Sequence, residues 1–341
     1  MNQKRKKQLM WQVPFLLLLI IGTILIIRQQ RSMPYQTDKG GIFGTFYTVT
    51  YQSDKNFQKE IEAELMKVDS ALSMFNEHSI ISRINRGNGG EANKMFMDVF
   101  NKALEVSEET DGAFDITVAP LVNAWGFGFK NGETPTRQQV DSIRRFIGWK
   151  KVTAEGMNIK KSDRRVMLDC SAIAKGYGVD MVAQLLKSKG ITNYMVEIGG
   201  EVITSGINPR RVPWRIAVIK PTDDTLSVNN DRQAVLNVTD KAMATSGNYR
   251  RFYCKGGKRY AHTIDPKTGY PVQHNILSAT VLAADCTTAD AYATSFMVMG
   301  LEKAKAILEK HPELMAYIIY NDKDNKSAVW FTPSLKDKIE E

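Results

Sequence analysis

The sequence predicts an α+β fold in which helices and strands alternate irregularly around one mixed sheet layer, rather than a doubly wound sheet. The segment 44–51, GTFYTVTY, is rich in Thr, Tyr and Val, as strands are. Apolar residues recur at helical spacing over about residues 55–73. The 341 residues are 43% hydrophobic and 24% charged and contain no internal repeat, which favours an ordinary globular domain over extensive disorder.

Residues 1–32 are expected to be a basic stub and a transmembrane anchor that precede this fold. MNQKRKK leads into an apolar run, Leu9 to Ile27, which as a helix would span about 28 Å, close to the ~30 Å hydrocarbon core of a bilayer. Basic residues cluster before the run, which favours an N-terminus inside the cell. A cleaved signal peptide is the alternative, but RQQRSMPYQ offers no small-x-small cleavage site. The expected location is the cell inner membrane, crossed once, with the globular part on the periplasmic side.

The formal net charge of +9 does not indicate a nucleic-acid partner. Six basic residues and no acidic residue lie in residues 1–32, so the rest of the chain carries only +3. No basic run interleaved with aromatic residues follows, although such a run is the usual footprint of a nucleic-acid binder. We therefore expect the inner membrane, and no nucleic acid, among the partners of this chain.

The rest of the chain is expected to be a linker, residues 33–41, followed by one globular unit, residues 42–335. After the strand at 44–51 and the helix at 55–73, residues 73–93 and 110–128 are expected to be irregular because they mix Gly, Pro, Asn and aromatic residues. Further helices are expected at 94–108, 175–190, 287–299 and 301–310, strands near 193–198, 214–220, 234–239, 258–264 and 277–284, and a hairpin of 314–320 with 327–332.

The segment TTADAYATSFMVMG places two oxygen ligands on one face of the helix that Gly300 ends. Asp290 and Thr294 are four residues apart, so both side chains project from the same face. Ala289 and Ala293 beside them add little bulk. A carboxylate and a hydroxyl with room for an oxygen-rich ligand suit a hard divalent cation such as Mg²⁺. A capped or solvated helix face is the alternative for this pair taken alone.

His262 is a candidate general base. It precedes the turn DPKTG, in which Asp265 can bond its own backbone, Pro266 fixes φ and Gly269 is free to adopt a left-handed conformation. A histidine held at a rigid turn, with an unperturbed pKa near about 6.5, is well placed for proton transfer. A structural or exposed histidine is the alternative.

Two further segments could approach a ligand closely. In LDCSAIAKGYGVD (168–180), small residues precede Lys175 and Gly176, which open a helix whose N-terminus favours an anion, although the spacing is not that of a Walker A loop. The Gly-Gly pair of EIGGEV (197–202) permits close backbone approach, or is only a bulge. Aromatic residues of GAFDITVAPLVNAWGF (112–127), with Phe75, could clamp a planar heterocycle, or each could belong to the core.

Taken together, six ordered blocks resemble the ApbE family of FAD:protein FMN transferases. The blocks are GAFD…PLV…WGF, D-x-S-A-I-A-K-G-Y-x-V-D, G-G-E, SGNYRR, H-T-I-D-P-K-T-G-Y-P-V and T-A-D-A-x-A-T, over about residues 40–332. The resemblance implies the ApbE fold, a mixed α+β architecture likened to a T-shape. It also implies FAD as substrate, Mg²⁺ as cofactor, and transfer of FMN to a threonine hydroxyl of an extracytoplasmic acceptor protein with release of AMP.

By position, the resemblance also implies the site residues. The metal ligands would be the carbonyl of Ala172 and the side chains of Asp290 and Thr294, and His262 would be the base. The FAD contacts would be Phe43, Phe75, Ala113, Phe114, Asp115, Asp169, Lys175 and Ile264.

Two positions depart from the family's pattern. Phe43 stands where the family usually has Met, and Phe75-Asn76 stands where it usually has Tyr-Asp, which keeps a ring but loses a hydroxyl and a charge. An FAD pyrophosphatase that gives FMN and AMP is therefore an alternative, because water could replace the acceptor hydroxyl. A flavin-binding module without turnover is a third possibility.

Overall fold

A central antiparallel sheet organises the molecule. The computed structural model describes residues 3–87, 89–128, 134–221, 231–248, 252–255 and 258–340. Within these residues the sheet has eight strands in the order β1-β2-β6-β7-β10-β13-β14-β15. Their bounds are β1 (Tyr35–Ile42), β2 (Thr45–Gln52), β6 (Tyr194–Ile198), β7 (Glu201–Ser205), β10 (Ala242–Gly247), β13 (Ile276–Ala283), β14 (Met315–Asn321) and β15 (Ser327–Phe331).

Three smaller strand groups surround this sheet. One has the order β16-β9-β8, a second the order β3-β5-β4, and a third is the hairpin β11–β12. Their bounds are β3 (Gly89–Glu91), β4 (Val152–Glu155), β5 (Asn158–Lys161), β8 (Arg215–Ile219), β9 (Arg232–Asn237), β11 (Phe252–Lys255), β12 (Lys258–Ala261) and β16 (Ile339–Glu340).

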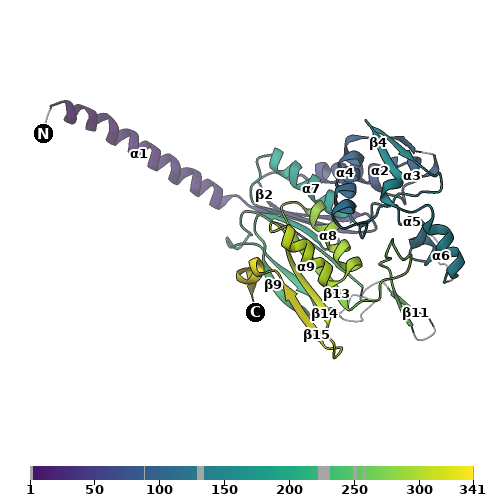
Figure 1. Cartoon of the computed structure of the whole chain (residues 1–341). Coiled ribbons are helices and arrows are strands. Elements are labelled where there is room, and N and C mark those ends of the chain that lie inside the picture. The colour runs from purple at the N-terminus through teal and green to yellow at the C-terminus, as the bar shows by residue number, and fades with distance from the viewer. Residues whose placement is uncertain are drawn as a thin grey trace.

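Helices cover one face of the central sheet, and α8 and α9 are seen over the strands β13 and β14 in Figure 1. The helices of this layer are α2 (Gln58–Leu72), α7 (Ala174–Ser188), α8 (Cys286–Met299) and α9 (Leu301–Lys310). The remaining helices are α1 (Gln3–Ser32), α3 (Ile80–Arg86), α4 (Lys94–Glu109), α5 (Ala119–Ala124) and α6 (Arg137–Arg144), with short 3₁₀ turns at Trp149–Lys151 and Pro333–Lys338.

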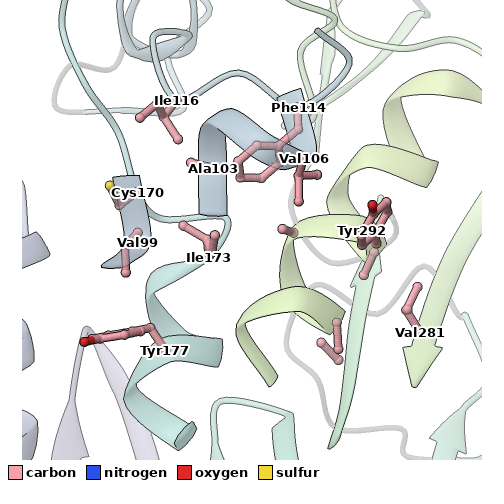
Figure 2. Close-up of a cluster of buried hydrophobic side chains, with 14 of the residues drawn as sticks. Val99, Ala103, Val106, Phe114, Ile116, Cys170, Ile173, Tyr177, Val281 and Tyr292 are labelled. Carbon is pink, nitrogen blue, oxygen red and sulfur yellow. The ribbon is translucent and has the colours of Figure 1, made fainter. Parts of the chain in front are cut away.

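The core lies on both faces of the sheet because successive strand residues point in opposite directions. On β10, Ala244 packs in the helix-side cluster, whereas Met243 packs in a second cluster with Val218 of β8 and Leu236 of β9. The small sheet of β8, β9 and β16 therefore packs on the face opposite the helices. The helix-side cluster also contains Phe114, as Figure 2 shows.

The predicted α+β class is confirmed, because helices cover one face of an antiparallel sheet. The linker expected at residues 33–41 is wrong, since this segment forms most of β1 and pairs with β2 along its whole length. The error has a physical cause, because β1 is an edge strand and carries a buried charge in place of an apolar pattern. Asp38 accepts hydrogen bonds from Tyr51 Oη at 2.7 Å and Asn56 Nδ2 at 2.8 Å.

The irregular region expected at residues 73–93 is also corrected in part, because it contains α3 and β3. Ser79 is the N-cap of α3, and its hydroxyl accepts a hydrogen bond from Ser82 N at 3.1 Å. The buried residues Ile81 and Ile84 hold this short helix on the core. A serine cap before two isoleucines three residues apart was the available signal.

The helix α1 extends away from the globular body (Figure 1). No helix in the described part of the chain combines the length and the apolar character needed to cross a membrane. The anchor expected in residues 1–32 stays a prediction.

Asp180 of α7 holds the N-terminus of α8 and so positions the helix that carries Asp290 and Thr294. Its Oδ1 accepts a hydrogen bond from Cys286 N at 2.8 Å, and its Oδ2 accepts from Thr287 N at 2.8 Å and from the Thr287 hydroxyl. Burial raises the pKa of Asp180 to about 6, although these hydrogen bonds oppose the shift.

We expect Asp180→Asn to lower the free energy of unfolding by about 1–3 kcal/mol at pH 7, because the amide cannot accept all three hydrogen bonds. The pKa of Asp180 in the folded state lies above the unfolded value of about 3.9. The folded state therefore binds more protons between about pH 4 and pH 6, and the stability due to this group falls as pH rises through that window. Denaturant unfolding of both proteins at pH 4.5 and pH 7 measures this. If the free energy of unfolding of the wild type, relative to Asp180→Asn, increased with pH, the raised pKa of Asp180 would be contradicted.

Candidate active site

One cleft of about 1200 Å³ brings together all twelve residues expected in the site. It lies where α7 and α8 meet the ends of β7 and β10, and loops after α2 and α4 complete its wall. The residues from the expected set that line it are Phe43, Phe75, Ala113, Phe114, Asp115, Asp169, Ala172, Lys175, His262, Ile264, Asp290 and Thr294.

Asp290 and Thr294 lie one turn apart on α8, as the i, i+4 spacing predicted. Asp290 is only 3% exposed, and its Oδ2 accepts a hydrogen bond from Gly176 N at 3.0 Å. The Thr294 hydroxyl lies 3.0 Å from the hydroxyl of Ser246 on β10. Burial raises the pKa of Asp290, and the neighbouring Lys175 ammonium opposes this shift.

The carbonyl of Ala172 is available to a ligand because α7 does not use it. In a helix continued backwards, Gly176 N would donate to this carbonyl, but it donates to Asp290 instead. The first hydrogen bond of α7 runs from Tyr177 N to Ile173 O at 3.1 Å. Among the described residues, no hydrogen bond reaches the Ala172 oxygen.

These oxygens fit the hard cation that the sequence suggests. A backbone carbonyl, a carboxylate and a hydroxyl form an all-oxygen set, and Mg²⁺ typically binds one or two carboxylates and completes its shell with water and substrate phosphates. In the described ranges no group of three or more His, Cys, Asp or Glu side chains could hold a metal ion. Asp290 is thus the single anionic member of the expected set.

Lys175 and Glu201 form an ion pair beside Asp290. Glu201 begins β7, is only 3% exposed, and has an Oε2 atom for which the described residues provide no hydrogen-bond partner. Burial raises the pKa of Glu201 to about 8, against the opposing effect of Lys175. Burial disfavours the Lys175 ammonium, but the Glu201 and Asp290 carboxylates outweigh this, and the pKa of Lys175 is raised. Lys175 therefore presents a fixed positive charge at the cleft.

His262 directly follows β12 and lines the cleft, as expected. Its ring and that of Phe127 meet edge to face, with the ring centroids 6.4 Å apart. The next residues form the predicted turn, in which Gly269 has φ of 78° and donates from its N to Asp265 O at 2.8 Å. Trp125 Nε1 donates to Gly269 O at 2.8 Å, and this buried hydrogen bond holds the turn in place.

The aromatic residues suggested as a clamp play different parts. Phe75 is 75% exposed at the rim of the cleft, which excludes the alternative that it packs in the core. Phe114 is 2% exposed, and its ring packs in the helix-side cluster (Figure 2), so it can offer a ligand its backbone but not its ring face. Trp125 is buried against Tyr260 and Tyr270 under the turn.

Phe43 and Gly44 form a two-residue turn between β1 and β2, with φ of 51° and 71°. Positive φ at both positions is the type I′ arrangement, which matches the twist of the two strands. The Phe43 ring lies against α7 at Gly178, where an added Cβ would come within 2.8 Å of it.

Three residues that were expected to contact FAD instead interact mainly with other parts of the protein. Asp115 Oδ1 accepts from Thr117 N at 2.8 Å, and its Oδ2 accepts from Trp149 N at 2.9 Å. Asp169 Oδ1 accepts from Ser171 N at 2.8 Å. Ile264 is buried in a small cluster with Trp125. Burial raises the pKa of both aspartates. These residues shape the cleft wall.

Sequence reasoning missed Glu201, Ser246 and Asp180. Glu201 and Asp180 stand inside two of the blocks that resemble the family, G-G-E and D-x-S-A-I-A-K-G-Y-x-V-D, but neither block indicates the partner of its acidic residue. Ser246 begins the block SGNYRR.

Comparison with known proteins places the chain in a family. The model of the ApbE family matches residues 43–319. An FAD:protein FMN transferase of Vibrio cholerae is 40% identical over 294 residues, which is 83% of this chain and 87% of that protein. The FAD:protein FMN transferase of Escherichia coli strain K12 is 33% identical, over 87% of each chain. A solved structure of the flavin transferase ApbE from Vibrio cholerae superposes with a TM-score of 0.81 at 35% identity, covering 90% of this chain and 99% of that one. The chain therefore belongs to the ApbE family.

Proposed function

We propose that this chain is an Mg²⁺-dependent FAD:protein FMN transferase, which moves the FMN part of FAD to a threonine hydroxyl of an acceptor protein and releases AMP. The observation that carries the proposal is the convergence of an all-oxygen cation set, a fixed ammonium and a histidine in one cleft. The names of the relatives support the same reaction.

The residues of the cleft suit a pyrophosphate. Ala172 O, Asp290 and Thr294 would hold the cation, which when bound neutralises phosphate charge as the bond breaks. The Lys175 ammonium adds positive charge on the same side of the cleft. Phe75 offers an exposed ring face on which a planar group of FAD can stack.

The transfer exchanges one phosphorus–oxygen bond for another. The threonine Oγ attacks the FMN phosphorus and forms the new bond, while the bond from this phosphorus to the bridging oxygen breaks. AMP leaves with that oxygen. His262 accepts the proton of the threonine hydroxyl, the task of a general base held between a strand and a rigid turn.

Incubation of the full chain with FAD, Mg²⁺ and a candidate acceptor protein separates this reaction from its rivals. A fluorescent acceptor band on a denaturing gel demonstrates transfer. Free FMN with AMP and no labelled protein would demonstrate a pyrophosphatase. FAD that stays bound and chemically unchanged would indicate a flavin-binding module without turnover.

We expect Asp290→Asn to lower Mg²⁺-dependent transfer by at least about 100-fold, because changes to the outer partners of metal ligands already cost about 10–100-fold. Asn keeps the acceptor for Gly176 N but removes the single anionic oxygen ligand. Asp324→Asn, on the exposed turn between β14 and β15, is the control. Mg²⁺ titrations of transfer by both variants measure the effect. Wild-type activity of Asp290→Asn at sub-saturating Mg²⁺ would exclude the site.

We expect His262→Ala to slow transfer by about 10²–10⁴-fold, the usual contribution of a general base, with unchanged affinity for FAD. Single-turnover transfer and FAD fluorescence titration on the same sample separate the two effects. Equal losses of FAD binding and of transfer would assign His262 a structural role instead.

We also propose that residues 1–32 anchor the chain in the inner membrane, with the cleft on the periplasmic side. Apolar side chains of α1 are exposed, from 46% at Ile27 to 69% at Leu18, and a bilayer would cover them. The full chain should stay in carbonate-washed membranes, whereas a chain that begins at Met33 should be soluble. Expression of the full chain that gives a soluble product with its N-terminus near Ser32 would show cleavage instead.

A further inference from the structure

The cleft continues beyond the residues expected to contact FAD and the cation. The additional part has apolar and hydroxyl side chains from three strands, and we call it the β8 groove. Its residues are Val202 of β7, Ile216, Ala217 and Ile219 of β8, and Met243 and Thr245 of β10. None of them belongs to the twelve expected site residues, so the groove has no assigned occupant.

The β8 groove lies on the sheet face opposite α8. On β10 the Ser246 hydroxyl meets Thr294 of α8, whereas the Thr245 hydroxyl meets Thr280 on the other face at 2.8 Å. Met243 shares that other face with Val218. The cleft therefore passes around the end of β10. Thr245 and Ser246 lie at the boundary between its two parts.

Two strand edges border this groove. β10 pairs with β13 along its whole length, but with β7 only at Ala242 and Met243. β8 pairs with β9 and with no other strand among the residues that the structure describes. Such edges present backbone N–H and C=O groups that can bind an added extended chain.

The register shows which backbone groups of β8 face away from β9. Val238 N donates to Trp214 O at 3.1 Å, so these two residues form a hydrogen-bonded pair. In an antiparallel ladder such pairs alternate with non-bonded ones. Ile216 and Val218 therefore bond to β9, and the N–H and C=O of Ala217 point to the open edge.

A shift in the ladder after Val218 preserves this pattern. Lys220 N donates to Asp231 O at 2.8 Å, so Lys220 again belongs to a bonded pair. Ile219 then offers its N–H and C=O to the open edge, as Ala217 does. Both residues line the cleft.

We propose that the β8 groove binds an extended segment of the acceptor protein by adding it to the open edge of β8. This inference rests on the proposed function, which requires a polypeptide to reach the phosphorus of bound FAD. Backbone pairing with Ala217 and Ile219 would hold the segment, and the apolar groove residues would take its alternate side chains. The acceptor threonine then crosses this boundary at Ser246 and reaches toward Thr294 and His262.

A flavin is a poorer occupant of this groove, because the C2=O, N3–H and C4=O groups of its rings lie on one short edge and cannot pair with both Ala217 and Ile219, which are two residues apart along an extended strand. The polar groups that suit a pyrophosphate, Lys175 and Asp290, lie on the other face of the sheet. The two substrates would thus approach the reacting atoms from opposite faces.

Substituting Pro for Ala217 tests the backbone pairing, because it removes an N–H that faces the groove and no hydrogen bond to β9. Ser327→Pro is the matched control on β15, the far edge strand. Asp322 N donates to Lys326 O at 2.8 Å, so Ser327 belongs to a non-bonded pair and its N–H also points outward.

The probe is a pool of nine-residue peptides with a central threonine and randomised flanks, and covalent flavin on the peptides is the readout. We expect Ala217→Pro to lower peptide labelling by about tenfold, the equivalent of about 1.4 kcal/mol, while FAD affinity stays unchanged. Ser327→Pro should change neither quantity. A second pool, N-methylated at alternate flanking residues, should be labelled about tenfold more slowly by the wild type, and this comparison does not depend on the folding of any variant.

Three results would overturn the inference. A parallel loss of FAD affinity in Ala217→Pro would assign the groove to the flavin. Equal labelling of both pools, together with normal labelling by Ala217→Pro, would exclude backbone pairing. Wild-type labelling of intact acceptor without labelling of any peptide would exclude an extended segment. A wild type that binds FAD but never releases AMP would instead refute the proposed function itself.

Discussion

The contact of α7 with α8 at Gly176 is the constraint on which the site depends. A Cβ atom at this position would lie 2.4 Å from the carbonyl oxygen of Cys286, so only glycine permits the approach. The approach brings Gly176 N to Asp290, which orients that carboxylate and at the same time frees the carbonyl of Ala172. One close helix crossing thus positions two of the proposed oxygen ligands. Asp180 strengthens the same crossing from the next turn of α7.

The electrostatic state of the cleft follows from this crossing. Asp290 and Glu201 are both buried, and one ammonium, that of Lys175, interacts with both of them. Two carboxylates beside one cation leave an excess of negative charge when both are ionised, which burial makes costly. A divalent cation bound as proposed would relieve that cost, and the anionic phosphates of a substrate would then balance the cation. In the proposed reaction the charges of the site would therefore balance only with both ligands present.

The sequence predicted the parts of the site that local spacing determines. Asp290 with Thr294 follows from helical periodicity, and the turn after His262 follows from the residue types in DPKTG. Contacts made across the chain were not accessible in this way. Asp180 reaches Cys286 over 106 positions, and no periodicity within either segment encodes that pairing. The strand β1 escaped prediction for another reason, because an edge strand that buries a carboxylate lacks the apolar alternation by which strands are identified.

The two hairpin turns at the rim of the cleft have a consequence for the free energy of binding. Gly199 and Gly200 join β6 to β7 as directly as Phe43 and Gly44 join β1 to β2, and both glycines have positive φ. Gly199 N donates to Phe46 O at 3.0 Å, which ties one hairpin to the other. A wall made of such short, mutually bonded connections has little conformational freedom left to lose. Binding at this wall incurs almost no ordering entropy, so contacts made there contribute to affinity nearly in full.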